Sequence, residues 1–370
     1  MALLDRYLAR EILPPFAAGV LFLTQLFLAT QIVGQARILF GSGVSLRDVA
    51  VVVVCLVPNV LAYVIPIAFL LGAIVGVGRL AGDREVVALS AAGISPARLV
   101  RVPLALSLIV AAAGLWLALE VEPMGLRTAR LTMNDIVMRS ITLGVRGGTF
   151  YDQIPGYTLY VAEARDGQWE NVLVHDMSDP AAAVLAVAKR GRLEPAGQRE
   201  DMRLVLEAGE LHREQADADE YVVAEFARGE LVLGVGTTVT ESNRVISPRE
   251  QTLAGYADRI ADARRRGDAV DARRWEGNLQ RKIASVLVVI PFALLAVPLG
   301  AWRRGGRAFG VAATCLIVVV DYVLMRGGQV LVQRGSLPAV LGLELGNIVL
   351  VTAALGLIAV LDRRGPGAVR

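Results

Sequence analysis

The sequence predicts a polytopic α-helical membrane protein with six transmembrane helices and an inserted periplasmic antiparallel β-jelly-roll domain. Two observations predict this fold class. First, 55% of the 370 residues are hydrophobic, and they are concentrated in roughly the first 120 and the last 90, as expected of helices solvated by lipid. Second, the segment between these two blocks is charged and alternates polar with apolar residues. The pattern therefore indicates two membrane blocks around a water-exposed insertion.

Six segments are candidates for transmembrane helices, since a helix needs about 20 apolar residues to cross the hydrocarbon core. Four of them carry no charge, namely residues 12–36, 50–78, 102–119 and 283–302. The fifth begins near Ala308 and contains Asp321, and the sixth covers residues 338–361 and contains Glu344. Intramembrane acids usually have a partner, so we expect a structural pair with an arginine rather than a proton path. The patterns GAIVG (72–76) and GLELG (342–346) permit close helix approach.

The distribution of arginine predicts the orientation. If the N-terminus is cytoplasmic, the cytoplasmic segments hold twelve arginines and the opposite short loops hold four. The twelve are Arg6, Arg10, Arg79, Arg84, Arg98, Arg101, Arg303, Arg304, Arg307, Arg363, Arg364 and Arg370, and the four are Arg37, Arg47, Arg326 and Arg334. The positive-inside rule then places both termini in the cytoplasm and the insertion in the periplasm.

The insertion divides into a β part and a helical part. From about Gly144 to Gly236, segments such as TLYVAEA and ENVLVHD have period two and are separated by turn residues, which predicts a sandwich or jelly roll with one buried face. We assign residues 123–247 to this domain. Residues 248–282 change to a helical pattern, with Ser247 as N-cap and a break near Gly267. They predict a charged helical hairpin that connects back to residues 283–370.

Several kinds of site are not predicted in this chain. His175 and His212 are the only histidines and are too few for an ordinary zinc site. No G-x-x-x-x-G-K-[ST] loop occurs, so ATP and Mg²⁺ have to be bound by another protein. A basic, aromatic-interleaved patch for nucleic acid is also missing. Cys55 and Cys315 lie in apolar runs, so we expect no disulfide in the insertion. No catalytic, cofactor or metal residues are assigned.

The loop between the second and third helices, LAGDREVVALSAAGISPARLVRVP, predicts a short cytoplasmic helix over about residues 84–92. Asp83 is its expected N-cap, Gly93 fits the left-handed position after its end, and Ser95-Pro96 opens the next helix. We expect Glu85, Val86, Val87 and Leu89 to form a partly apolar exposed face. Composition alone favours an ordinary interfacial helix here.

This loop resembles the LptF/LptG permease family of the lipopolysaccharide-export ABC transporter. GRLAGDREVVALSAAGIS (78–95) is close to the family pattern, although Ser90 stands at the usual position of an arginine and Arg84 where serine is common. The resemblance continues in RYLAREIL, VIPIAFLLGAIVGVGRL, RKIASVLVVIPFALLAVPLG and SLPAVLGLELGNIVLV. It covers nearly the whole chain. The basic and apolar residues of the first span and of the PIAFLLG stretch are slightly more similar to LptF than to LptG.

The resemblance implies a permease subunit that extracts lipopolysaccharide from the bacterial inner membrane. Its implied protein partners are a second LptF/LptG-type permease, an LptB-like ATPase dimer, and LptC-like and LptA-like jelly-roll proteins. The short loop helix would be the coupling helix, with Glu85, and beside it Arg84, Val87 and Leu89, at the ATPase contact. Arg37 and Arg326 are candidates for binding the lipid headgroup, and the alternative for both is an interface anchor.

Three functions are alternatives to lipopolysaccharide transport. A non-transporting ABC complex that transmits force to the periplasm would keep the coupling helix and the outer domain but need no lipid cavity. An ion-coupled transporter using Asp321 and Glu344 predicts an internal repeat, and the two halves show none. A membrane-embedded enzyme is least favoured, because no catalytic arrangement lies at a shared membrane depth.

Overall fold

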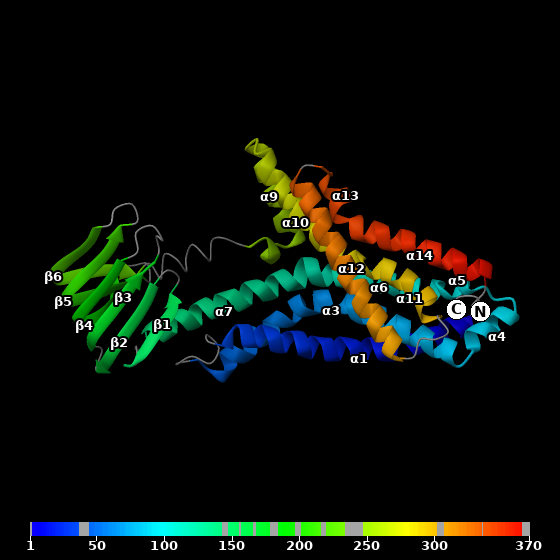
Figure 1. The fold of residues 1–370 in the computed structure, drawn as a ribbon, viewed down its shortest axis with the longest axis horizontal. Coiled ribbons are helices and arrows are strands. Elements are labelled where there is room, and N and C mark those ends of the chain that lie inside the picture. Colours follow the sequence, from blue (N-terminus) through cyan, green and yellow to red (C-terminus); the bar gives the residue numbers. More distant parts are fainter. Residues whose placement is uncertain are drawn as a thin grey trace. The chain divides into compact units, whose positions relative to one another are not determined.

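The computed structural model describes residues 2–36, 44–142, 147–154, 157–165, 168–177, 184–196, 201–215, 220–233, 247–301, 307–334 and 336–364. They belong to two compact units (Figure 1). The helical unit comprises Met1–Gln31, Val54–Leu126 and Ser247–Arg370, and the β unit comprises Ile32–Val53 and Arg127–Ile246.

The first block of helices contains two long helices, two short ones and a third long helix built from three parts. Its elements are α1 (Ala2–Gly34), α3 (Leu46–Gly82), α4 (Glu85–Ala91), α5 (Pro96–Leu99), α6 (Arg101–Trp116), the π-helical turn η1 (Leu117–Val121) and α7 (Glu122–Thr142). The second block contains the 3-10 turn η3 (Pro248–Glu250), α9 (Leu253–Arg265), α10 (Ala269–Leu287), α11 (Val289–Gly300), α12 (Arg307–Gln333), α13 (Ala339–Leu343) and α14 (Leu345–Arg364).

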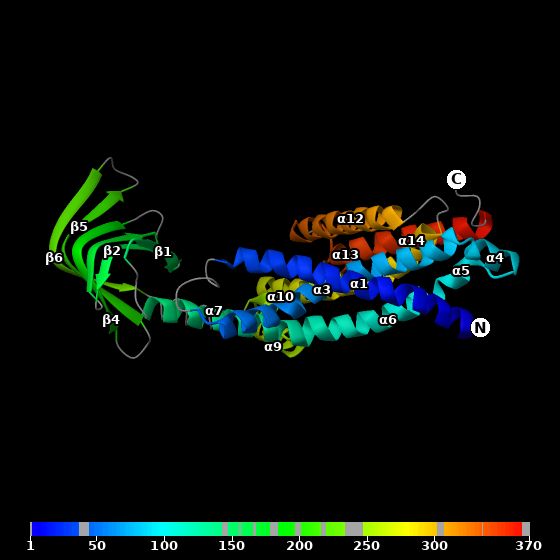
Figure 2. The same cartoon turned by 90° about the horizontal axis from the view of Figure 1, so that it is seen from below.

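Within the described residues, six helices are long and apolar enough to cross a membrane, which confirms the predicted number. They are Leu3–Gly34, Leu46–Gly82, Pro96–Ile136, Ala269–Gly300, Phe309–Val332 and Leu345–Arg363. The sixth begins after Glu344, so this acid precedes the helix that was expected to contain it. In both views, the start of α1, the end of α14 and α4 lie at one end of the helical unit (Figures 1 and 2).

The third helix continues well past its predicted end at residue 119. The predicted start of the β domain at residue 123 is therefore wrong, because α7 extends to Thr142 and the first strand begins at Thr149. The charge-free length marks where the hydrocarbon core ends, but a helix can continue into water. From Leu126 to Thr142 the sequence contains no proline or glycine, so nothing local ends the helix there.

The predicted helical hairpin is present as α9 and α10. Gly267, with φ of 73°, makes the turn between them, and the side chain of Asp268 caps α10 by accepting from the amides of Val270 and Asp271. The Ser247 side chain makes no capping hydrogen bond, and η3 is a single 3-10 turn. Thr252 caps α9 instead, by accepting from the Gly255 amide.

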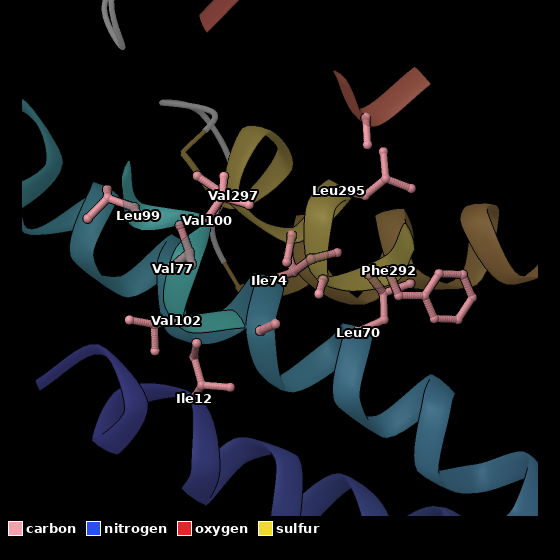
Figure 3. Packing of buried hydrophobic residues seen from close by; sticks show 14 of the residues in the cluster. Ile12, Leu70, Ile74, Val77, Leu99, Val100, Val102, Phe292, Leu295 and Val297 are labelled. Atoms are coloured by element: carbon pink, nitrogen blue, oxygen red, sulfur yellow. The ribbon is translucent and has the colours of Figure 1, made fainter. Parts of the chain in front are cut away.

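One hydrophobic cluster holds the helical unit together (Figure 3). It includes Ile12 of α1, Ile74 of α3 and Phe292 of α11, all at most 2% exposed. Glycine lets α3 approach α1 closely, as the GAIVG pattern predicted. A Cβ on Gly72 would lie 2.6 Å from the Phe16 backbone nitrogen, and one on Gly76 would lie 2.8 Å from the Glu11 carbonyl oxygen.

The β unit contains one antiparallel sheet with the strand order β1-β2-β3-β4-β5-β6, so each strand pairs with its neighbours in sequence. The strands are β1 (Thr149–Ile154), β2 (Tyr157–Arg165), β3 (Gln168–Asp176), β4 (Val184–Ala196), β5 (Asp201–Gln215) and β6 (Glu220–Leu233). Alternating residues such as Val161, Val172 and Leu204 share its buried face. The antiparallel β domain is thus confirmed, and its described strands form a single curved sheet (Figure 2).

Candidate functional site

The short helix α4 is the strongest sequence-predicted site, and its backbone ends as expected. The Gly93 and Ile94 amides donate to the carbonyl oxygens of Ser90 and Leu89, both at 3.0 Å. Gly93 has φ of 81°, so the helix closes with a Schellman motif. Its start differs from the prediction. Arg84, with φ of 58°, occupies the N-cap and makes no side-chain cap, so Asp83 is not the cap.

The side chains of α4 divide between the core and the surface. Val86 is 1% exposed and belongs to the hydrophobic cluster of the helical unit, and Leu89 packs against that cluster. The expected exposed face of Val86 and Leu89 is therefore wrong, because these two side chains anchor α4. Arg84 and Val87 are exposed, and Glu85 is half-buried beside them. An available contact surface thus remains around Glu85.

Two polar contacts connect α4 and its surroundings to α1. The Tyr7 hydroxyl donates to Oε1 of Glu85 at 3.1 Å. One turn further along α1, Oε2 of Glu11 accepts from the Arg79 guanidinium at 2.8 Å. A cavity of about 530 Å³ adjoins this ion pair between α1, α3, α11 and α12. The start of α1 is thereby tied both to the loop helix and to the end of α3.

Of the two arginines predicted to bind lipid, only Arg326 lies within the described residues. Arg37 lies outside the described residues. Arg326 is exposed on α12, where its guanidinium donates to Oε1 of Gln329 at 3.1 Å and lies 5.9 Å from the centre of the Tyr322 ring. Both contacts are within its own helix, which holds the guanidinium at the surface of α12.

The two predicted intramembrane acids have different surroundings from those expected. Glu344 lies between α13 and α14, and its carboxylate accepts from Nε2 of Gln280 at 2.9 Å and from Nδ2 of Asn347 at 2.6 Å. Its partners are thus amides and not an arginine. Asp321 lies against Gly346, and Arg326, the nearest arginine in sequence, donates to Gln329 instead.

A buried cluster that sequence reasoning missed lies at the other end of the helical unit. The Lys282 ammonium of α10 is 3.5 Å from Oε2 of Glu122, and their side chains are only 11% and 4% exposed. Nearby, the Tyr256 hydroxyl donates to the Pro248 carbonyl oxygen, and burial raises the pKa of Tyr256 to about 12. The sequence offers one indication of this cluster. Lysine is rare in this chain, which contains only Lys189 and Lys282, so Lys282 stands out beside the apolar fourth span.

The histidines give no sign of a metal centre in the part of the chain that the structure describes. No group of three or more potential ligands occurs among these residues. His212 lies 3.5 Å from a carboxylate oxygen of Glu210 on the same strand. Cys55 and Cys315 are free thiols.

Comparison with known proteins identifies one family. The family model described as the lipopolysaccharide export system permease LptF/LptG matches residues 6–360. The match includes both helical blocks, the loop helix and the whole inserted β unit. A search of curated proteins gives no significant match.

Proposed function

The chain belongs to the LptF/LptG family of lipopolysaccharide export permeases, and we propose that it is one of two permease subunits of an ABC exporter. In this proposal the exporter extracts lipopolysaccharide from the inner membrane and passes it to a periplasmic bridge of β-jelly-roll domains. The observation that carries this proposal is the extent of the family match. It includes the six candidate spans and the β unit rather than one motif alone. Transport is thereby favoured over a complex that only transmits force, because the family is one of permeases.

The proposed complex needs partners. We infer a second LptF/LptG-type permease, an LptB-like ATPase dimer that binds ATP and Mg²⁺, and LptC-like and LptA-like jelly-roll proteins that receive the lipid. The proposed orientation has both termini in the cytoplasm and the β unit in the periplasm. The arginine bias supports it, and so does the position of α4 beside the ends of α1 and α14.

The proposed ATPase contact is the exposed surface of α4 around Glu85, with Arg84 and Val87 next to it. Leu89 supports this contact from below, because it packs on the core cluster that also holds Val86. Because these side chains anchor α4, a movement of the bound ATPase can be transmitted through α4 to α3 and α11. The Glu85–Tyr7 hydrogen bond extends the same connection to α1.

The proposed cargo is an acidic glycolipid with several acyl chains. Arginines at the periplasmic ends of the first and fifth spans can bind its phosphates through bidentate, charge-assisted hydrogen bonds. Arg37 and Arg326 are the candidates, and the exposure of Arg326 is consistent with this role.

The function is tested by reconstituting the purified complex with its ATPase into lipopolysaccharide-containing liposomes. A photoreactive amino acid is placed at Val161, on the buried face of the sheet. We expect ATP-dependent crosslinking of lipopolysaccharide at this position. An active ATPase without any crosslinked lipid would contradict transport and favour the complex that only transmits force.

A further inference from the structure

The Glu122–Lys282 ion pair occupies a special place in the chain. Glu122 is the first residue of α7, the helix through which the chain leaves the helical unit towards the strands. Lys282 lies on α10, which continues through Val288 into α11 of the fourth span. The pair therefore joins the third span to the fourth, the two spans between which the strands are inserted in the sequence.

Lys282 also contacts η3, the turn with which the chain re-enters the helical unit after the strands. Its ammonium donates to the Arg249 carbonyl oxygen at 3.2 Å, in η3, which directly precedes α9. The neighbouring Pro248 carbonyl oxygen accepts from the buried Tyr256 hydroxyl. One ammonium group thus contacts both the outgoing helix α7 and the returning turn η3.

Burial makes this an unusual way to join two segments. Two charges taken out of water gain little net stability even when paired, and an apolar pair of similar size often serves stability as well. Breaking one partner, however, leaves a buried charge alone. The pair therefore fixes position more effectively than it adds stability. The π-helical turn η1 immediately before Glu122 supports a special role, since such turns are frequent at functional sites.

The pair is also connected to the proposed ATPase contact. From Lys282, the helix continues into α11, where Phe292, Ala296 and Val297 belong to the core cluster. Val86 of α4 belongs to the same cluster. A movement of α4 can thus reach α10 through packed side chains and a continuous helix, the kind of physical network that carries coupling between distant sites.

We propose that Glu122 and Lys282 are a positioning pair that makes the outgoing helix α7 and the returning turn η3 move as one body with the fourth span. ATP-driven movement of the helical unit is thereby transmitted to the β domain, where it is used for lipid transfer. This inference rests on the proposed function. It assigns to the two residues a role in the efficiency of coupling, separate from ATP binding and from lipid recognition.

The test uses the whole complex, with Glu122→Gln and Lys282→Met as variants that remove one charge each and keep the side-chain length. The matched control is Glu276→Gln, because Glu276 forms an exposed ion pair with Arg264 in the same hairpin. Transfer is measured as lipopolysaccharide crosslinked at Val161 for each ATP hydrolysed. We expect this ratio to fall about fivefold or more in both variants, the lower end of typical coupling between sites, and to stay unchanged in the control.

Two further comparisons separate positioning from mere stability. The double variant should be no worse than Lys282→Met alone, because Lys282→Met already removes the ion pair together with the contact to the Arg249 carbonyl oxygen, and the exchange of the two charges should partly restore transfer. Unchanged transfer per ATP in Glu122→Gln would overturn the proposal. So would a loss of transfer that parallels an equal loss of ATPase activity and protein yield, since that indicates a structural role only.

A second readout does not depend on lipid. Spin labels are attached at Met124 of α7 and Ala257 of α9, both exposed, after Cys55 and Cys315 have been replaced. We expect one narrow distance distribution throughout the ATP cycle in the wild type and a broadened one in Glu122→Gln. If the wild type transfers no lipid, the proposed function fails, whereas a distance distribution that stays narrow in Glu122→Gln refutes the positioning pair.

Discussion

The Tyr7 hydroxyl donates a hydrogen bond of 3.1 Å to Oε1 of Glu85, although the two residues are 78 positions apart. The contact ties the first turns of α1 to the short loop helix α4. Glu85 therefore has a partner within the chain in addition to its proposed contact with the ATPase. The two contacts can be separated by mutation, because Tyr7 contributes only to the first.

We predict that Glu85→Lys weakens binding of the ATPase by roughly tenfold or more, since reversing a charge at an interface costs several kcal/mol. The cost to folding is expected to be small, about 0.3–1 kcal/mol through the helix dipole and about 0.5–1.5 kcal/mol for the lost hydrogen bond from Tyr7. The measurement is co-purification and ATPase stimulation at normal protein levels. Tyr7→Phe is the control, because it removes the intrachain hydrogen bond and keeps the carboxylate. If Tyr7→Phe is as damaging as Glu85→Lys, the intrachain contact explains the defect.

The orientation predicts which positions a membrane-impermeant thiol reagent can reach from the periplasm. In a chain without Cys55 and Cys315, we expect a cysteine replacing the exposed Gln168 of β3 to be labelled in intact cells with a permeabilised outer membrane. A cysteine replacing the exposed Ala91 of α4 should react only after the inner membrane is opened. The opposite pattern would invert the topology and remove α4 from the reach of a cytoplasmic ATPase.

The number of spans, the antiparallel β domain and the loop helix could be predicted because each leaves a local pattern. Lipid solvation requires long apolar runs, a half-buried strand alternates, and Gly93 marks the left-handed end of α4. Which face of α4 is buried could not be predicted. Val86 and Val87 are chemically the same, and only the tertiary position of the core decides that one is 1% and the other 44% exposed.

Polar partners were the least predictable feature. Glu344 pairs with Gln280, which is 64 positions away, and Glu122 pairs with Lys282 although the whole segment Arg127–Ile246 lies between them in the sequence. No local pattern encodes such distances in sequence. The expectation of an arginine for Glu344 followed from charge alone, whereas the packing of α10 against α13 brings a neutral amide to the carboxylate.

The lipid-binding prediction concerns Arg37 and Arg326, for which we propose a position at the periplasmic ends of spans one and five. We expect Arg37→Glu to impair export strongly and Arg37→Lys mildly, because lysine cannot reproduce a bidentate contact with phosphate. Arg326→Glu should have a smaller effect, since the Arg326 guanidinium is already engaged with Gln329 and Tyr322. Export is measured by crosslinking at Val161, with ATPase assembly as control. Wild-type export in Arg37→Glu means that this residue is only an interface anchor.

The buried Tyr256 gives a pH prediction. Its pKa in the folded state is about 12, above the ordinary value of 10.0, because burial disfavours the phenolate. The resulting stabilisation is complete below pH 10 and is lost as the pH rises towards 12. In a difference titration of wild type against Tyr256→Phe, we expect the missing tyrosinate absorbance near pH 12. A signal near pH 10 would mean that the hydroxyl is open to water.

Tyr256→Phe should also destabilise the protein by about 1–3 kcal/mol, because the Pro248 carbonyl loses its donor.

Glu344 offers a direct test between a structural role and ion-coupled transport. Its two carboxylate oxygens accept separately from Gln280 and Asn347. Glu344→Ala removes both contacts and should lower stability by about 1.5–3 kcal/mol, the usual range for hydrogen bonds to charged groups. Glu344→Gln keeps one acceptor and turns a donor towards the other amide, so we expect a loss roughly half as large. The measurement is the thermal midpoint in detergent, and Asp362→Ala, an exposed carboxylate on α14, is the control.

A double-mutant cycle with Gln280→Ala should then give a coupling energy of about 0.5–3 kcal/mol, because the two side chains are in contact. Transport per ATP by the folded fraction of Glu344→Gln is expected to equal that of the wild type. Ion coupling makes the opposite prediction, since a carboxylate that carries a cation or a proton through the cycle cannot be replaced by an amide. Lost transport in a Glu344→Gln protein of wild-type stability would therefore assign Glu344 to the transport cycle, and unchanged transport with lowered stability assigns it to the joint between α10, α13 and α14.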